Sequence, residues 1–370
     1  MAINIRRRKF LITLGGAAAA WPLAARAQQP ETMRRLEGLM AKISDSELER
    51  LISAAENRRV LDFRNRIRPE SSEVLANKRK LGEQIRAFLT KSGLELEKLD
   101  KIIADNQSER RRLLEKEKAQ AQKVLPKIED TFRHGIDGRF KAFELANSSN
   151  INPPTFTVLD TPTFIHAHPR NILTASHIEP RNSTAQIRYV TTDTDEGTED
   201  ASASFFFQWQ NSSLNPVLLA NIASHLVVKG LFEVTAALSV FLGPNFSQLG
   251  ANAELRLLEL WNQPATQPLW EQDNQWTGIL SVHVEGPRTP LGRIQEDEYE
   301  WVFNGYDVKY SSLAVPPKGV VLFEVSLAWG AFIVGGPCTA SVTIEGHGSA
   351  LLCPFVKFEV REVIQSGPPL

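Results

Sequence analysis

The hydrophobic pattern of this chain changes its period once, near residue 147, and that change limits the folds available to it. Before it, apolar residues recur at steps of three and four, as at Leu48, Leu51, Ile52 and Ala55. After it, apolar and polar residues alternate, as in "AQIRYVT" at residues 185–191. The first pattern is typical of an amphipathic helix, and the second of a strand with one buried face. The sequence therefore predicts a helical part followed by a β part.

The composition changes at the same place. Residues 31–147 carry 26 Lys or Arg and 21 Asp or Glu, whereas residues 148–370 carry 11 and 22. All four Tyr and six of the seven Trp lie in the second part. Two such different compositions in series indicate two domains. The stretch "ANSSNINPP" at residues 146–154 is a turn-rich linker, so we expect an α-helical module at 28–147 and a β domain at 148–370.

Helix signals fill most of the first part. Ser44 and Glu47 form a capping box, Pro69 ends the first helix, and Gly93 and Pro126 mark later breaks. These signals predict a coiled-coil-like hairpin or small bundle, which would mediate homo-oligomerisation or dock a partner. Basic and acidic residues alternate in it, which is typical of solvated helix faces. With few net charges and no interleaved aromatic residues, no nucleic-acid partner is expected.

Short alternating segments separated by Gly, Pro, Asn or Asp fill the second part. One of them, "PVLLANIASHLVVKG" at residues 216–230, places five apolar side chains on one face: Leu218, Ala220, Ile222, Leu226 and Val228. Many short strands without helical spacers predict an antiparallel β-sandwich, with a jelly-roll or immunoglobulin-like topology left open. The expected fold class is thus α+β and multi-domain: an N-terminal helical hairpin or bundle followed by this sandwich.

The first 27 residues have the three-part layout of a secretory signal. Basic residues 6–9 precede a short apolar run at 11–20, and Ala25-Arg26-Ala27 is a small-x-small cleavage site. The order "RRKFL" at residues 7–11 resembles the twin-arginine (Tat) type of signal peptide, which implies export of a folded protein to the periplasm or beyond. The apolar run is shorter than the ~20 residues of a membrane span, so no span is expected after cleavage. A general secretory signal and an ordinary basic N-terminal helix are the alternatives.

Cys338 and Cys353 are the two cysteines of the chain. If Glu345-Gly346 is a two-residue turn, a final hairpin places them directly opposite each other, and an exported protein meets oxidising conditions that permit a disulfide. If the turn is instead "GHGS" at residues 346–349, the pair is misaligned and both stay buried thiols.

Three histidines and an acidic stretch are candidate metal ligands. His166 and His168 would share one face of a strand, and with His177 they could form a zinc site, but solvated or hydrogen-bonded histidines are the favoured interpretation. In "DTDEGTED" at residues 193–200, three carboxylates could bind calcium: Asp193, Asp195 and Glu199. The alternative is a solvated acidic loop, and no cofactor is otherwise expected.

An aromatic set in the second part suggests ligand binding. Trp261, Trp270 and Trp276 lie in a segment rich in Pro, Gln and Asn. Exposed rings flanked by amides can stack on a sugar and hydrogen-bond its hydroxyls. The alternative is that these rings cover the edge of the core.

No nucleophile elbow, phosphate-binding glycine loop or H-E-x-x-H motif occurs in the chain. The sequence therefore favours an exported, non-catalytic binding or interaction protein, with a glycan or a protein as its partner, over an enzyme. Two alternatives remain: a metal-assisted hydrolase using the three histidines, and a purely structural envelope protein.

Overall fold

The computed structural model describes residues 133–143, 155–192, 197–237, 246–260, 269–271, 277–285, 295–334, 338–346 and 349–362, with scattered positions from Arg50 to Lys123. The chain divides into two compact units, Met1–Asp45 and Ser46–Leu370, and every described residue belongs to the second. The signal-like segment thus lies outside the described residues. The predicted domain division at residue 147 stays a prediction.

The first sheet contains eight described strands, each antiparallel to its neighbours. They are β1 (Thr155–Leu159), β3 (Leu173–His177), β4 (Thr184–Thr192), β6 (Val217–Ala237), β10 (Gln295–Val315), β12 (Cys338–Ile344), β13 (Ala350–Leu352) and β14 (Val356–Glu362). β6 is the centre of this sheet. β10 pairs along one edge of β6, and β14, β13 and β12 pair one after another along the other edge.

The second sheet contains six described strands and is also antiparallel. They are β2 (Phe164–His168), β5 (Gly197–Gln210), β7 (Phe246–Glu259), β8 (Leu269–Glu271), β9 (Thr277–Glu285) and β11 (Val320–Val334). The order is β2-β5-β11-β7, with β8 and β9 both paired to β7. A single 3-10 turn, η2 (Arg170–Ile172), connects β2 to β3 in the first sheet.

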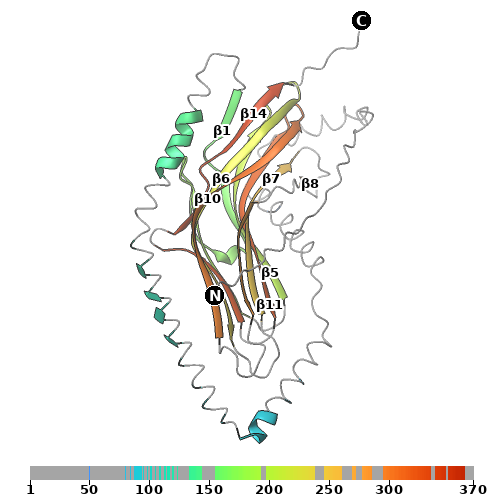
Figure 1. Cartoon of the computed structure of the whole chain (residues 1–370). Helices are drawn as coiled ribbons and strands as arrows, with labels where there is room; N and C mark the ends of the chain where they lie inside the picture. Colours follow the sequence, from blue (N-terminus) through green and yellow to red (C-terminus); the bar gives the residue numbers. More distant parts are fainter. Residues whose placement is uncertain are drawn as a thin grey trace, which may run out of the picture. The chain divides into compact units, whose positions relative to one another are not determined.

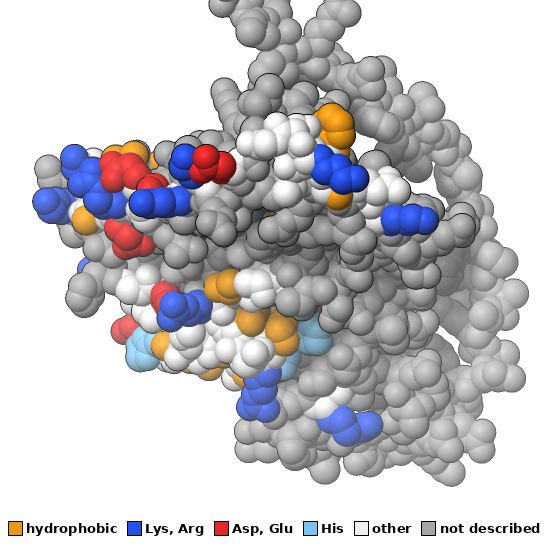
Figure 2. Space-filling model, turned by 90° about the horizontal axis from the view of Figure 1, so that it is seen from below, with side chains coloured by type: hydrophobic (Ala, Val, Ile, Leu, Met, Phe, Trp, Pro, Cys, Tyr) orange, Lys and Arg blue, Asp and Glu red, His pale blue; other side chains and the backbone are white. Residues whose placement is uncertain are grey.

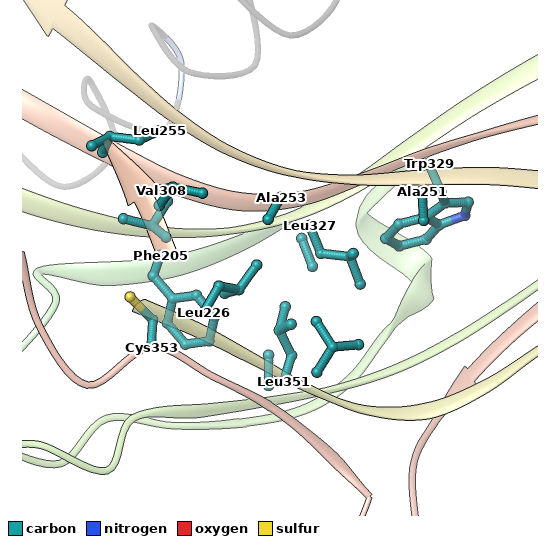
Figure 3. Close-up of a cluster of buried hydrophobic side chains, with 14 of the residues drawn as sticks. Phe205, Leu226, Ala251, Ala253, Leu255, Val308, Leu327, Trp329, Leu351 and Cys353 are labelled. Carbon is teal, nitrogen blue, oxygen red and sulfur yellow. The ribbon is translucent and has the colours of Figure 1, made fainter. Parts of the chain in front are cut away.

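The hydrophobic core lies between the two sheets, which Figure 1 shows as two layers of long strands. Phe358 of β14 stacks on Phe323 of β11 with ring centroids 5.2 Å apart, and Trp209 of β5 meets Phe358 edge-on at 5.4 Å. Figure 3 shows the same arrangement further along, where Phe205 of the second sheet and Leu226 of the first point into one interior. Alternation produces this core, because every second residue of each strand faces inward. The β-rich part of the prediction is therefore confirmed.

The predicted α+β class, with an N-terminal helical hairpin or bundle, is wrong. The described residues are mostly β, in two antiparallel sheets, and among them no N-terminal bundle or coiled coil is seen. The physical reason lies in burial. Phe88 and Leu113, two apolar residues of the part predicted to be helical, are 67% and 48% exposed, so they lack the buried contacts that hold a bundle together. Helical periodicity predicted helical residues, but it could not show what their apolar side would pack against.

Candidate functional site

The outer face of β10, directed away from the core, carries a row of three aromatic side chains. Val302 and Val308 belong to the core, so the odd-numbered residues in the part of β10 from Tyr299 to Lys309 point outward. Among these, Tyr299 is 37% exposed, and the half-buried rings of Trp301 and Phe303 are nearly parallel, with centroids 5.6 Å apart and planes 11° apart. We call Tyr299, Trp301 and Phe303 the aromatic row.

Hydroxyl groups lie on the same outer face, two strands away from the aromatic row. In β12 the core positions alternate with half-buried Thr339, Ser341 and Thr343. β6 lies between β10 and β12, and its Thr235 shares a 2.5 Å hydrogen bond with Thr339. The indole Nε1 of Trp301 is buried without a hydrogen-bond partner among the described residues. Leaving such a buried donor unsatisfied costs roughly 1–3 kcal/mol.

Further along the same face, two titratable or charged groups, His225 and Arg139, converge on Asp307 of β10. His225 Nδ1 on β6 lies 2.8 Å from Asp307 Oδ1. Arg139, from the helical segment 133–143, donates to the same carboxylate from both terminal nitrogens, at 2.8 and 3.5 Å. Gly305 makes room for the imidazole, because a Cβ there would lie 2.4 Å from His225 Nε2.

The environment lowers the pKa values of both His225 and Asp307, for different reasons. Burial lowers the pKa of His225, and the positive charge of Arg139 adds to that effect, against the opposing hydrogen bond to Asp307. For Asp307, burial acts to raise the pKa, but hydrogen bonds from Arg139 and His225 outweigh it and lower the pKa. The cluster therefore favours an ionised Asp307 beside a neutral His225, whose Nδ1–H donates to the carboxylate.

A second polar cluster lies on the outer face of the second sheet. Ser204 of β5 donates a 2.6 Å hydrogen bond to Glu324 of β11, and both are buried. The neighbouring Ser326 hydroxyl is buried without a partner among the described residues. On β7, Arg256 forms an ion pair with Glu254, and these two residues lie opposite Glu324 and Ser326 of β11. Chemically this cluster can satisfy a water molecule or another small polar group.

The structure places the three predicted histidines on two different sheets. His166 and His168 are half-buried neighbours on β2, opposite Ser204 and Ser202 of β5. His177 ends β3 in the first sheet, where its side chain is exposed and lies 3.4 Å from Glu179. Across the described residues, no group of three or more His, Cys, Asp or Glu side chains could hold a metal ion.

Two other predicted sites lie largely outside the described residues. Asp193 and Asp195 are not described, whereas Glu199 lies within β5 and pairs with Ala331 in the backbone register. Trp261 and Trp276 are not described, and of Trp270 only the backbone is described, as part of β8. Calcium binding and sugar binding at these positions stay predictions.

The hairpin predicted between the two cysteines is corrected by the register of β12 and β13. Both strands pair with β6 in the same direction, so they lie end to end along it, and Gly346, after the end of β12, has a φ of +92°. Cys338 pairs with Ala236, whereas Leu352, next to Cys353, pairs with Val227. At about 3.3 Å per residue, the two cysteines are roughly 30 Å apart. A disulfide between them does not fit this geometry, and both are buried thiols.

In one part of the face drawn in Figure 2, described Lys and Arg side chains lie beside Asp and Glu side chains. Among the described residues, no helix is long and apolar enough to cross a membrane.

Comparison with known proteins adds no family. No family model matches the chain, and no curated protein matches it. A chain in the solved "Structure of infectious bursal disease virus Gt strain" aligns at 14% identity, over 54% of this chain and 49% of the viral one, with a TM-score of 0.07. This chain thus spans about half the length of the viral chain, and a score of that size supports no argument about fold or function.

Sequence reasoning missed the cluster around Asp307. Its members lie 82 and 168 positions from Asp307 along the chain, and no local motif connects such distant residues. One usable signal was present: the alternation around Leu226 places His225 on the opposite, outer face of the same strand.

Proposed function

We propose that this protein is an exported, non-catalytic binding protein and that the outer face of β10, β6 and β12 recognises a neutral carbohydrate. Export is supported by the signal-like N-terminal sequence, which directs the chain to the periplasm or outside the cell. The observation that carries the binding proposal is the aromatic row, with Tyr299 exposed and two parallel rings beside it.

The chemistry of this face suits a sugar for two reasons. Aromatic rings contribute flat apolar area that can pack on the C–H face of a sugar ring, and their few rotatable bonds keep the entropy cost of binding low. The hydroxyl groups of β12 and the carboxylate of Glu233, which lies opposite Tyr299, can hydrogen-bond the sugar's hydroxyls. Because residues 148–370 carry twice as many acidic as basic residues, a neutral ligand is favoured over an acidic one.

The test is glycan binding by the full chain without its signal segment, on a panel of neutral and acidic oligosaccharides. We expect a neutral oligosaccharide to quench tryptophan fluorescence, and Trp301→Ala to weaken binding at least tenfold, which corresponds to about 1.4 kcal/mol. Leu214→Ala is the matched control, because Leu214 is an apolar side chain that is 82% exposed and lies away from the aromatic row.

Two outcomes contradict the proposal. One is equal binding by Trp301→Ala and the unaltered chain. The other is loss of binding only in Trp270→Ala or Trp276→Ala, which would move the sugar site to the segment around β8. Circular dichroism of each variant separates lost binding from lost folding.

A further inference from the structure

The helical segment 133–143 is attached to the first sheet by an apolar stripe and by one polar bridge. Ile136 and Phe140 are 8% and 4% exposed, and they pack on Val227, Leu352 and Phe355 of the sheet side. The rings of Phe140 and Phe355 meet edge-on at 5.5 Å. Residues at i and i+4 share one helix face, so these contacts form a single stripe.

The polar bridge passes through one carboxylate. Asp307 Oδ1 lies 2.8 Å from Arg139 Nη1 of the helix and 2.8 Å from His225 Nδ1 of the sheet. His225 is only 7% exposed. Helix docking therefore brings a permanent positive charge to the carboxylate that already accepts a hydrogen bond from the imidazole.

The other charged groups near this site are mostly cationic. β10 brings Lys309 to the same outer face as Asp307, β6 brings the buried Lys229, and β14 brings Lys357, whose ammonium lies 4.7 Å from the Phe143 ring. Arg181 covers the Phe140 ring at 4.2 Å. From the helix itself come four further titratable or charged residues: Arg133, His134, Asp137 and Lys141. A proton added to His225 would thus enter a buried site in which Asp307 is the nearby anion.

We propose that helix 133–143 is a pH-released cover: protonation of His225 loosens the Asp307 bridge, frees the helix, and uncovers the apolar patch of Val227, Leu352 and Phe355. Exposed contiguous apolar surface of this kind promotes association with other surfaces. This inference goes beyond the proposed sugar binding and does not depend on it.

The direction in which pH changes helix docking follows from proton linkage. In the docked state, burial and Arg139 hold the pKa of His225 below its ordinary value, near 6.5. Undocking removes Arg139, whose positive charge opposes protonation of the imidazole, so the undocked state binds the proton more readily. Docking is then fully favourable above about pH 6.5, and it weakens as the pH falls from there toward the lower docked pKa, by at most tenfold per pH unit.

Hydrogen exchange of the full chain measures this directly, with each rate corrected for the intrinsic exchange rate at its pH. We expect protection of the peptide covering residues 133–143 to fall between pH 7.5 and 5.5, by up to about tenfold. Protection of β11, a core strand, should stay constant and so exclude global unfolding. Unchanged protection of the helix over this range, or a parallel loss in β11, would overturn the proposal.

Variants assign the effect to one residue. His225→Asn keeps an N–H donor for Asp307 but cannot be protonated, so its helix protection should not depend on pH. His134→Asn is the matched control, an exposed histidine on the helix itself, and it should behave like the unaltered chain. The reverse result for either variant refutes the mechanism. If His225→Asn fails to fold, Arg139→Gln takes its place. An undiminished pH dependence of helix protection in Arg139→Gln would also refute the mechanism.

Discussion

The end-to-end pairing of β12 and β13 with β6 gives a quantitative prediction about the two cysteines. A hairpin with a Cys338–Cys353 bond would close a loop of 15 residues, and the chain-entropy model assigns such a bond about 3 kcal/mol of stability at 25 °C. The observed register separates the two positions by nine residues of β6. Reduction should therefore change the free energy of unfolding by less than about 0.5 kcal/mol, the range typical of changes that touch no structural feature.

Two measurements on the chain purified from the exported fraction check this prediction. Urea unfolding with and without a reductant should give the same midpoint. A thiol reagent should label two cysteines per chain in denaturant. In the folded state labelling should be very slow, because both side chains are buried and burial raises the pKa of the Cys353 thiol to about 12.

A different pair of results would refute the reasoning from register. If no thiol reacts in denaturant, and a reductant lowers the free energy of unfolding by about 3 kcal/mol, the final strands form the hairpin after all. Because Cys338 and Cys353 are the chain's two cysteines, the intact mass distinguishes an internal bond from a bond to another molecule.

Two further predictions concern the core. Phe358→Ala should lower the free energy of unfolding by about 3–5 kcal/mol, because Phe358 is fully buried and contacts two rings of the opposite sheet. Phe88→Ala, at a 67% exposed position, should change the free energy of unfolding by no more than about 0.5 kcal/mol. Urea titration of both variants makes the comparison. Gly230→Ala should lower the free energy of unfolding by about 1–3 kcal/mol through overpacking, since its Cβ would lie 2.5 Å from Ile344 Cγ1 and 2.9 Å from the Thr343 carbonyl oxygen. A variant as stable as the unaltered chain would show that β12 is not held so closely to β6.

Alternation predicted the β domain well but failed where a strand changes its register. The sequence "PVLLANIASHLVVKG" predicts Leu218 and Ala220 on the same face as Ile222. In the structure Leu219 faces the core instead, together with Ile222 and Leu226. Asn221 has a φ of +52°, and β14 shifts its register opposite this position. A bulge adds one residue to one strand and so exchanges the two faces, which local alternation cannot reveal.

The final strands show a related limit. A hairpin and two strands that follow each other end to end give the same sequence pattern: two alternating segments with a glycine between them. What decides between them is the partner, and β6, with 21 residues, is long enough to pair with β12 and β13 in succession. Sequence patterns describe single strands, whereas this choice depends on the length of a strand more than a hundred residues away.

The candidate site was only partly predictable, for the same physical reason. The spacing of two placed His166 and His168 on one strand, as the structure has them in β2, but they lie outside the candidate site on β10 and β6. The cluster of Arg139, His225 and Asp307 depends on a helix and two strands meeting on the outer side of a sheet. Outer faces of strands are read as solvated when their residues are polar, so a buried outer position such as His225 has no signature in a local pattern.

Both proposals concern the outward-facing residues of one strand, and this links them physically. Phe303, the last ring of the aromatic row, and Asp307 lie four residues apart on β10, which is about 13 Å. Gly305 lies between them and carries the imidazole of His225 over its backbone. A ligand on the aromatic row that extends further than this distance along β10 would therefore meet Arg139 and the docked helix. If the helix leaves at low pH, the accessible part of β10 lengthens toward Asp307. Long oligosaccharides should therefore gain affinity on acidification in the unaltered chain but not in His225→Asn. Short oligosaccharides should bind the unaltered chain and His225→Asn equally at either pH.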